Sequence, residues 1–213
     1  MFDNILFDLD GTLTDPEVGI TNSVMYALKH WGIEVAQRSE LYCFIGPPLM
    51  DSFQKYYGFS QAESEEALRL YREYFSKKGL YENELYPDTI DILNALKKDG
   101  KKIILATSKP EEYAVEILKH FNLYDYFDFV SGATMDESRN KKDEVIAYTL
   151  EKCNLQGDKH TVMIGDRNHD VLGAKANSLP SIGVLYGYGD LQELQSAGAD
   201  FIAETQKDIL KFI

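Results

Sequence analysis

The stretch FDLDGTLTD, residues 7–15, decides the fold, because it ends an apolar run on two carboxylates and then turns at a glycine. The preceding residues, MFDNIL, continue that run back to the N-terminus and are typical of a buried strand. Asp8 and Asp10 lie one residue apart, and like charges this close raise each other's pKa unless a positive charge lies between them. The stretch therefore indicates either an Asp-rich turn at a strand end or a cation site.

Composition limits the classes of function. The chain has 213 residues, of which 44% are hydrophobic and 27% charged, as in ordinary globular proteins. It has no apolar run near the roughly 20 residues of a membrane span, and its start lacks a secretory signal. A net charge of −13 argues against nucleic-acid and membrane partners, so an anionic substrate needs cations supplied locally. Cys43 and Cys153 have no metal-type spacing, and we expect two buried, reduced thiols in a cytoplasmic protein.

Short apolar runs alternate with helical patterns over most of the chain. The predicted strands are 1–10, 101–107, 127–131, 160–165 and 181–185, and the predicted helices are 87–100, 110–121, 142–153 and 167–177. The helix 87–100 carries Ile90, Leu93 and Leu96 on its apolar face. This alternation predicts an α/β fold with a doubly wound parallel sheet.

Residues 15–83 interrupt this alternation and contain only helical patterns. Asp15 and Pro16 predict the N-cap and first turn of a helix that ends near Trp31. Ser60 and Glu63 form a capping-box pattern for a second helix. We therefore expect an α/β core from 1–14 and 84–213, with a helical domain of residues 15–83 inserted after the first strand.

Oxygen-bearing side chains follow three of the predicted strands. They are Asp8 and Asp10, Thr107 and Ser108, and Asp166 and Asp170. The carboxyl ends of parallel strands meet at one edge of a sheet, where ligands bind. Four carboxylates gathered there without a counter-charge are costly, and a hard divalent cation removes that cost. Mg²⁺ is the expected ion, because it takes few carboxylates together with water and phosphate.

Together these motifs resemble the haloacid dehalogenase superfamily. The matching residues are DLDGTLT at 8–14, ATSK at 106–109, Lys142, and Gly165-Asp166 followed by Asp170. The helical insertion and SRNKKDEVIAYTLEK at 138–152 are similar to its phosphoglycolate phosphatase-like branch. The resemblance implies a Rossmannoid core with a helical cap, in a monomer or homodimer. It also implies a Mg²⁺-dependent phosphatase that hydrolyses a small phosphorylated metabolite (phosphoglycolate, a sugar phosphate or a nucleotide) through an aspartyl-phosphate.

The resemblance also implies a role for each matching residue. Asp8 is the expected nucleophile, Asp10 the acid and base, and Lys142 the cation that neutralises the nucleophile and phosphate. Substrate binding is expected from Gly11, Thr107, Ser108 and Lys142. The expected metal ligands are Asp8, Asp10 through its backbone carbonyl, and Asp166, with Asp170 in support.

Several residues allow a second interpretation. Thr107 and Ser108 are also typical caps for the helix that follows Pro110. Lys141 is the alternative to Lys142, while Asp170 is either a metal ligand or a partner of one. Lys109 and Arg139 are either local cations or solvated loop residues, and His169 is expected to be no ligand.

Two other functions remain open at this point. A phosphomutase of the same superfamily typically carries a histidine ten residues after the second Asp, where this chain has Ile20. A non-catalytic binding module would have no need of every motif residue. Dehalogenation is disfavoured, since Asp10 and a Mg²⁺ site serve phosphate chemistry.

Overall fold

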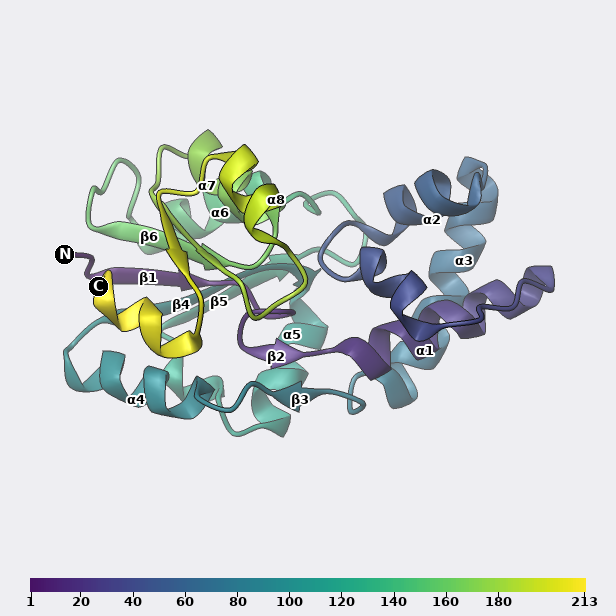
Figure 1. The fold of residues 1–213 in the computed structure, drawn as a ribbon, viewed down its shortest axis with the longest axis horizontal. Coiled ribbons are helices and arrows are strands. Elements are labelled where there is room, and N and C mark those ends of the chain that lie inside the picture. The colour runs from purple at the N-terminus through teal and green to yellow at the C-terminus, as the bar shows by residue number, and fades with distance from the viewer. The chain divides into compact units, whose positions relative to one another are not determined.

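A computed structural model describes residues 1–213 and divides into two compact units. One unit combines Met1–Asp15 with Leu85–Ile213, and the other is Pro16–Glu84 (Figure 1). Two short strands, β2 (Thr14–Asp15) and β3 (Glu84–Leu85), form a two-stranded sheet at the points where the chain passes from one unit to the other.

The first unit is built on a six-stranded parallel sheet in the order β5-β4-β1-β6-β7-β8. Its strands are β1 (Asn4–Phe7), β4 (Lys102–Pro110), β5 (Phe129–Ala133), β6 (Thr161–Gly165), β7 (Ser181–Val184) and β8 (Phe201–Ala203). The central strand β1 pairs with β4 and β6, so that Leu6 lies opposite both Ile104 and Met163. The run that ends in Asp8 and Asp10 is therefore the middle of the sheet.

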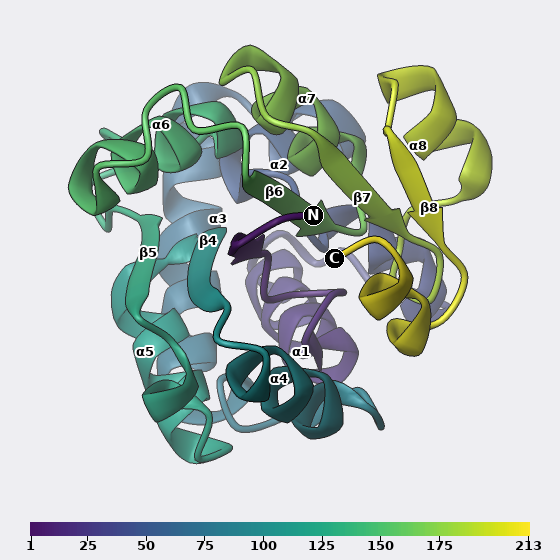
Figure 2. The same ribbon diagram turned by 90° about the vertical axis from the view of Figure 1, so that its left-hand side faces the viewer.

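Helices cover both faces of this sheet (Figure 2). One face carries α6 (Lys142–Cys153), α7 (Asn168–Ala176) and α8 (Leu191–Ala197). The other carries α4 (Thr89–Lys98), α5 (Glu111–His120) and the 3-10 helix η5 (Gln206–Lys211), with the short turn η4 (Tyr124–Tyr126) following α5. Leu6, Ile104 and Met163 pack against Val145 and Ile146 of α6 in a fully buried cluster. The predicted α/β class, a doubly wound parallel sheet with an all-helical insertion, is confirmed.

Some predicted boundaries were wrong for local reasons. The strand predicted at 127–131 begins only at Phe129, because the Asp128 carboxylate accepts hydrogen bonds from the Ile103 amide at 2.8 Å and from Lys97 at 3.0 Å. The strand predicted to end at residue 107 continues to Pro110 through a register shift after Ala106.

Two predictions about single side chains also need correction. Ile90 is 43% exposed, and Ile92 takes its place on the buried face of α4. Cys43 and Cys153 are free, as expected, but both are half-buried rather than buried. Strand β8 has only three residues, too few for a recognisable pattern, and was not predicted.

The second unit consists of helices. They are α1 (Glu17–Leu28), η1 (Lys29–Trp31), η2 (Arg38–Phe44), α2 (Leu49–Tyr57), α3 (Gln61–Tyr74) and the π-helical turn η3 (Phe75–Gly79). Phe44 and Phe53 pack edge to face at 5.0 Å between η2 and α2. The predicted capping box of α3 is confirmed, since Ser60 N donates to Glu63 Oε2 at 2.8 Å.

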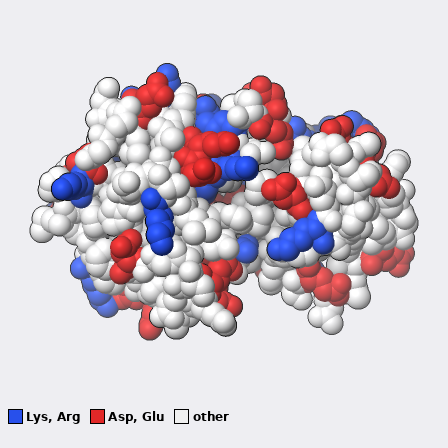
Figure 3. Space-filling view, turned by 90° about the horizontal axis from the view of Figure 1, so that it is seen from above, with Lys and Arg blue, Asp and Glu red and all other residues white.

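The expected N-cap of α1 was wrong. Pro16 occupies that position with no side-chain cap, because Asp15 belongs to β2 and its carboxylate accepts a hydrogen bond from the Tyr188 hydroxyl. None of the helices combines the length and the apolar character needed to cross a membrane. On the face drawn in Figure 3, basic side chains are dispersed among acidic ones in small groups.

Candidate active site

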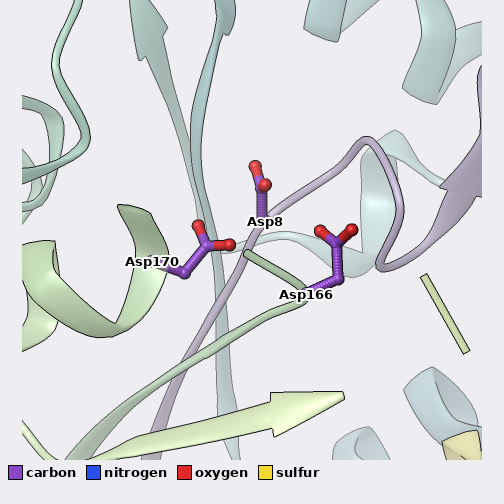
Figure 4. Close-up of side chains that lie close together, drawn as sticks. All are labelled: Asp8, Asp166 and Asp170. Atoms are coloured by element: carbon purple, nitrogen blue, oxygen red, sulfur yellow. The ribbon is translucent and has the colours of Figure 1, made fainter. Parts of the chain in front are cut away.

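All buried charged side chains of the chain lie in one site of the first unit. They are Asp8, Asp10, Lys109, Lys142, Asp166 and Asp170. One carboxylate oxygen from each of Asp8, Asp166 and Asp170 lies within 4.8 Å of the others. Figure 4 shows these three carboxyl groups turned toward a common space. We refer to Asp8, Asp166 and Asp170 as the carboxylate cluster.

The sheet and one helix position the carboxylate cluster. Asp8 follows β1 and continues its ladder, because its amide donates to Ile164 O of the neighbouring strand β6 at 2.9 Å. Asp166 follows the last residue of β6 directly. Asp170 lies in the first turn of α7, where its Oδ2 accepts a hydrogen bond from the Arg167 amide at 3.0 Å. The cluster thus forms at the carboxyl edge of the two central strands, as the topology requires.

Gly11 allows the turn after Asp10 to approach the cluster. Its φ of +81° lies in the left-handed region of backbone conformation, which residues other than glycine rarely adopt. A Cβ atom at this position would lie 2.2 Å from Asp166 Oδ2. The glycine of the DxDG motif is therefore required both by the turn and by the space that the Asp166 carboxylate occupies.

The loop after β7, which sequence analysis missed, also contacts the Asp166 carboxylate. Tyr188 N of this loop donates to Asp166 Oδ2 at 2.8 Å. Thr12 Oγ1, from the DxDGT motif, donates to Asp166 Oδ1 at 3.4 Å. The same loop reaches the motif through Tyr186, whose hydroxyl donates to Thr12 O at 3.0 Å. The available signal was the GYG sequence at 187–189, a glycine-rich loop at the carboxyl end of β7.

Lys142 connects two members of the carboxylate cluster. Its Nζ lies 2.7 Å from Asp8 Oδ1 and 2.8 Å from Asp170 Oδ1, and it donates to Ala106 O at 3.2 Å. Burial alone lowers the pKa of Lys142, but the Asp170 and Asp8 carboxylates outweigh burial and raise it, so the side chain is a fixed cation. Lys141 is exposed, so of the two candidate lysines it is Lys142 that reaches the cluster.

Asp10 lies outside the carboxylate cluster and has its own cation. Its Oδ2 is 2.6 Å from Lys109 Nζ, and both side chains are buried. Lys109 is therefore not a solvated loop lysine. Burial raises the pKa of the Asp10 carboxyl, and the opposing effect of Lys109 is smaller.

Thr107 and Ser108 stand at the end of the regular part of β4, next to Lys109. The Thr107 hydroxyl accepts a hydrogen bond from Lys109 N at 3.2 Å, and Ser108 is half-buried. The interpretation of these residues as helix caps is wrong, because Pro110 is the N-cap of α5 and no side chain caps that helix. Arg139 donates to Gly132 O at 3.0 and 3.1 Å and thereby anchors its own loop.

The buried charges do not balance without a further cation. The three carboxylates of the cluster, with Lys142 as the one lysine that contacts them, leave two negative charges, which is the charge that one divalent cation neutralises. Burial, together with the neighbouring carboxylates of Asp170 and Asp8, raises the pKa of Asp166 well above its ordinary value. Burial likewise raises the pKa of Asp170 to about 6 despite the opposing effect of Lys142. An all-oxygen donor set with this excess charge fits Mg²⁺.

Comparisons with known proteins agree with this fold. Residues 5–184 match the family model of the haloacid dehalogenase-like hydrolases. A 5'-nucleotidase of Pseudomonas aeruginosa is 45% identical over 195 residues, which cover 92% of this chain and 88% of that protein. The tyrosine-protein kinase PtkA of Mycobacterium tuberculosis is 35% identical over 206 residues, 97% of this chain and 67% of that protein. The crystal structure of "a predicted phosphatase from Clostridium acetobutylicum" superposes with a TM-score of 0.95 at 44% identity, covering 99% of both chains.

The chain belongs to the haloacid dehalogenase-like hydrolase family. Within that family it is a phosphatase.

Proposed function

We propose that this phosphatase depends on Mg²⁺ and hydrolyses small phosphomonoesters through an aspartyl-phosphate on Asp8. The observation that carries the proposal is the carboxylate cluster, whose three carboxylates exceed the charge of Lys142 by two. Asp8 and Asp166, together with the backbone carbonyl of Asp10, would hold the ion, and Asp170 would support them. Bound Mg²⁺ supplies positive charge that offsets the charge of the phosphoryl oxygens.

In the first half-reaction an Asp8 carboxylate oxygen bonds to phosphorus while the bond from phosphorus to the ester oxygen breaks. Asp10 gives its proton to the departing oxygen, and the raised pKa of Asp10 supports this role as an acid. Lys142, 2.7 Å from Asp8 Oδ1, keeps the nucleophile ionised and offsets charge as the phosphoryl group arrives. Thr107, Ser108 and the backbone at Gly11 would bind the phosphoryl oxygens.

In the second half-reaction water attacks the phosphorus of the acyl phosphate. Asp10, now a carboxylate, accepts a proton from that water, and the bond between phosphorus and the Asp8 oxygen breaks. Inorganic phosphate leaves, Asp8 is again a carboxylate, and Asp10 again carries its proton. Both residues thus return to their starting states, and one water is consumed for each ester.

We propose nucleoside 5'-monophosphates as the first substrates to test, since a relative at 45% identity is a 5'-nucleotidase. Phosphoglycolate and sugar phosphates complete the panel. The helical unit Pro16–Glu84 is proposed to act as the cap that selects among these substrates.

The test is a phosphate-release assay over this panel, scored by kcat/KM with Mg²⁺ and again with EDTA. We expect Mg²⁺-dependent release, and we expect none from Asp8→Asn protein that keeps its circular dichroism spectrum and melting transition. Normal turnover by the Asp8→Asn variant would contradict the proposal. A sugar 1-phosphate that becomes the 6-phosphate without release of phosphate would instead favour a phosphomutase.

A further inference from the structure

We propose that Lys109 is a positioning residue, which holds the Asp10 carboxyl group apart from the carboxylate cluster and in place to protonate the leaving group. This inference rests on the proposed function, in which Asp10 is the acid and base. It concerns the ATSK stretch, in which Thr107 and Ser108 were expected to bind substrate while the role of Lys109 was left open.

The contact between the two side chains is short and buried. Lys109 Nζ lies 2.6 Å from Asp10 Oδ2, and the side chains are 5% and 9% exposed. The other carboxyl oxygen, Asp10 Oδ1, is buried without a hydrogen-bond partner. An ammonium group can hold one oxygen of a carboxylate and leave the second one open. Lys109 thus fixes one oxygen of Asp10 and leaves Oδ1 for a proton that must be transferred.

The backbone that carries Lys109 is itself fixed from two sides. Its amide donates to Thr107 Oγ1 at 3.2 Å, within the segment where β4 shifts register. On the neighbouring strand β5, a Cβ atom added to Gly132 would lie 2.5 Å from Lys109 O. Only glycine therefore allows this close approach, and the position of Lys109 depends on it.

The charges in the site explain why Asp10 needs this separate partner. Lys142 is already shared between Asp8 and Asp170, at 2.7 and 2.8 Å. Without Lys109, the Asp10 carboxylate would be left to compete with those residues for Lys142 or for a bound cation. An acid that is drawn into the cluster is no longer in place to protonate a leaving group.

The dependence of kcat/KM on the leaving group distinguishes a positioning role of Lys109 from a purely structural one. p-Nitrophenolate departs readily without a proton, whereas phenolate depends more on the acid, and the two aryl phosphates are nearly alike in shape. We expect kcat/KM of Lys109→Met protein to fall at least about tenfold further for phenyl phosphate than for p-nitrophenyl phosphate, since general acids contribute about 10²–10⁴-fold. kcat/KM is the appropriate quantity, because it reports the half-reaction in which the leaving group departs.

Two further variants accompany this experiment. Gly132→Ala displaces the Lys109 backbone. Its kcat/KM should also fall further for phenyl phosphate than for p-nitrophenyl phosphate, but by less than in Lys109→Met. Lys101→Met is the matched control, because Lys101 lies just before β4, its side chain is 9% exposed and it pairs with Asp3 at 3.3 Å. Both kcat/KM values of this control should stay at the wild-type level.

The outcomes separate this inference from the function on which it rests. Equal losses on both aryl phosphates in the Lys109→Met and Gly132→Ala variants would overturn the positioning role. So would a raised KM with unchanged kcat, which would indicate that Lys109 contacts the phosphate directly. Wild-type protein that releases phosphate neither from these esters nor from any member of the substrate panel would overturn the proposed function, and this inference with it.

Discussion

Replacing Gly11 by alanine tests how closely the turn after Asp10 is built around the Asp166 carboxylate. The backbone at Gly11 has φ +81°, and the new Cβ would lie 2.2, 2.5 and 2.7 Å from Asp166 Oδ2, Cγ and Oδ1. Atoms at these distances cannot coexist, so the Asp166 carboxylate must move. Its hydrogen bond from Tyr188 N, now 2.8 Å long, is then lost.

The expected magnitude follows from these two effects. Left-handed backbone costs a residue other than glycine about 1–2 kcal/mol. Loss of a hydrogen bond to a charged group costs about 1.5–3 kcal/mol. Gly11→Ala should therefore reduce the free energy of unfolding by about 2.5–5 kcal/mol, which for a chain of this length lowers Tm by about 10 °C.

Gly100→Ala is the matched control for this substitution. Gly100 has φ +69°, but a Cβ atom there would meet nothing within 4 Å. Its cost should be the backbone term alone, about 1–2 kcal/mol. Urea unfolding of both variants, followed by circular dichroism, measures the difference, and a phosphate-release assay should show activity lost only in Gly11→Ala. Equal destabilisation of the two variants, with full activity in both, would refute the reasoning.

Three other perturbations act on the buried charges. EDTA should abolish phosphate release and added Mg²⁺ should restore it, whereas full activity of a metal-free preparation would contradict the carboxylate cluster as a metal site. Lys142→Met leaves Asp8 and Asp170 without their shared cation and should lower the free energy of unfolding by about 3–5 kcal/mol. Urea titration measures this change, and an unchanged free energy of unfolding would count against the ion pairs. In EDTA, the free energy of unfolding should fall as pH rises from 3.8 to about 6, because burial raises the Asp170 pKa and the folded state then binds more protons than the unfolded chain. Asp170→Asn should flatten part of this slope, and an equally steep slope in that variant would exclude Asp170 as its source.

Local patterns were sufficient to predict the frame of the fold. The alternation of apolar runs and helical segments gave the parallel sheet, because buried parallel strands and amphipathic helices differ in period. The order of strands then implied that Asp8 and Asp166 would meet, since both follow strands that end at the same edge. The position of Lys142 at the start of α6 followed from the motif, and its side chain does reach Asp8.

Contacts between distant parts of the chain could not be predicted in this way. Asp15 was expected to cap a helix, but its carboxylate accepts from Tyr188, 173 residues further along. Lys109 was ambiguous in the sequence, because its burial depends on Asp10, which lies beyond the end of another strand, and not on its own neighbours. The same holds for the 187–189 loop, whose hydrogen bond to Asp166 exists only once β6 and β7 are paired. Tertiary packing, which no short pattern records, decides such contacts.

The central claim is that Asp8 carries the phosphoryl group during turnover, and chemical trapping tests it most directly. Protein mixed with Mg²⁺ and a hydrolysed phosphomonoester is quenched within a turnover, reduced with borohydride, digested and read by tandem mass spectrometry. Borohydride converts an aspartyl-phosphate to homoserine. We therefore predict homoserine at position 8 in samples that contain substrate, and unmodified aspartate at position 8 in samples that lack substrate. Steady turnover with Asp8 unmodified at every quench time, or reduction at another residue, would contradict the account.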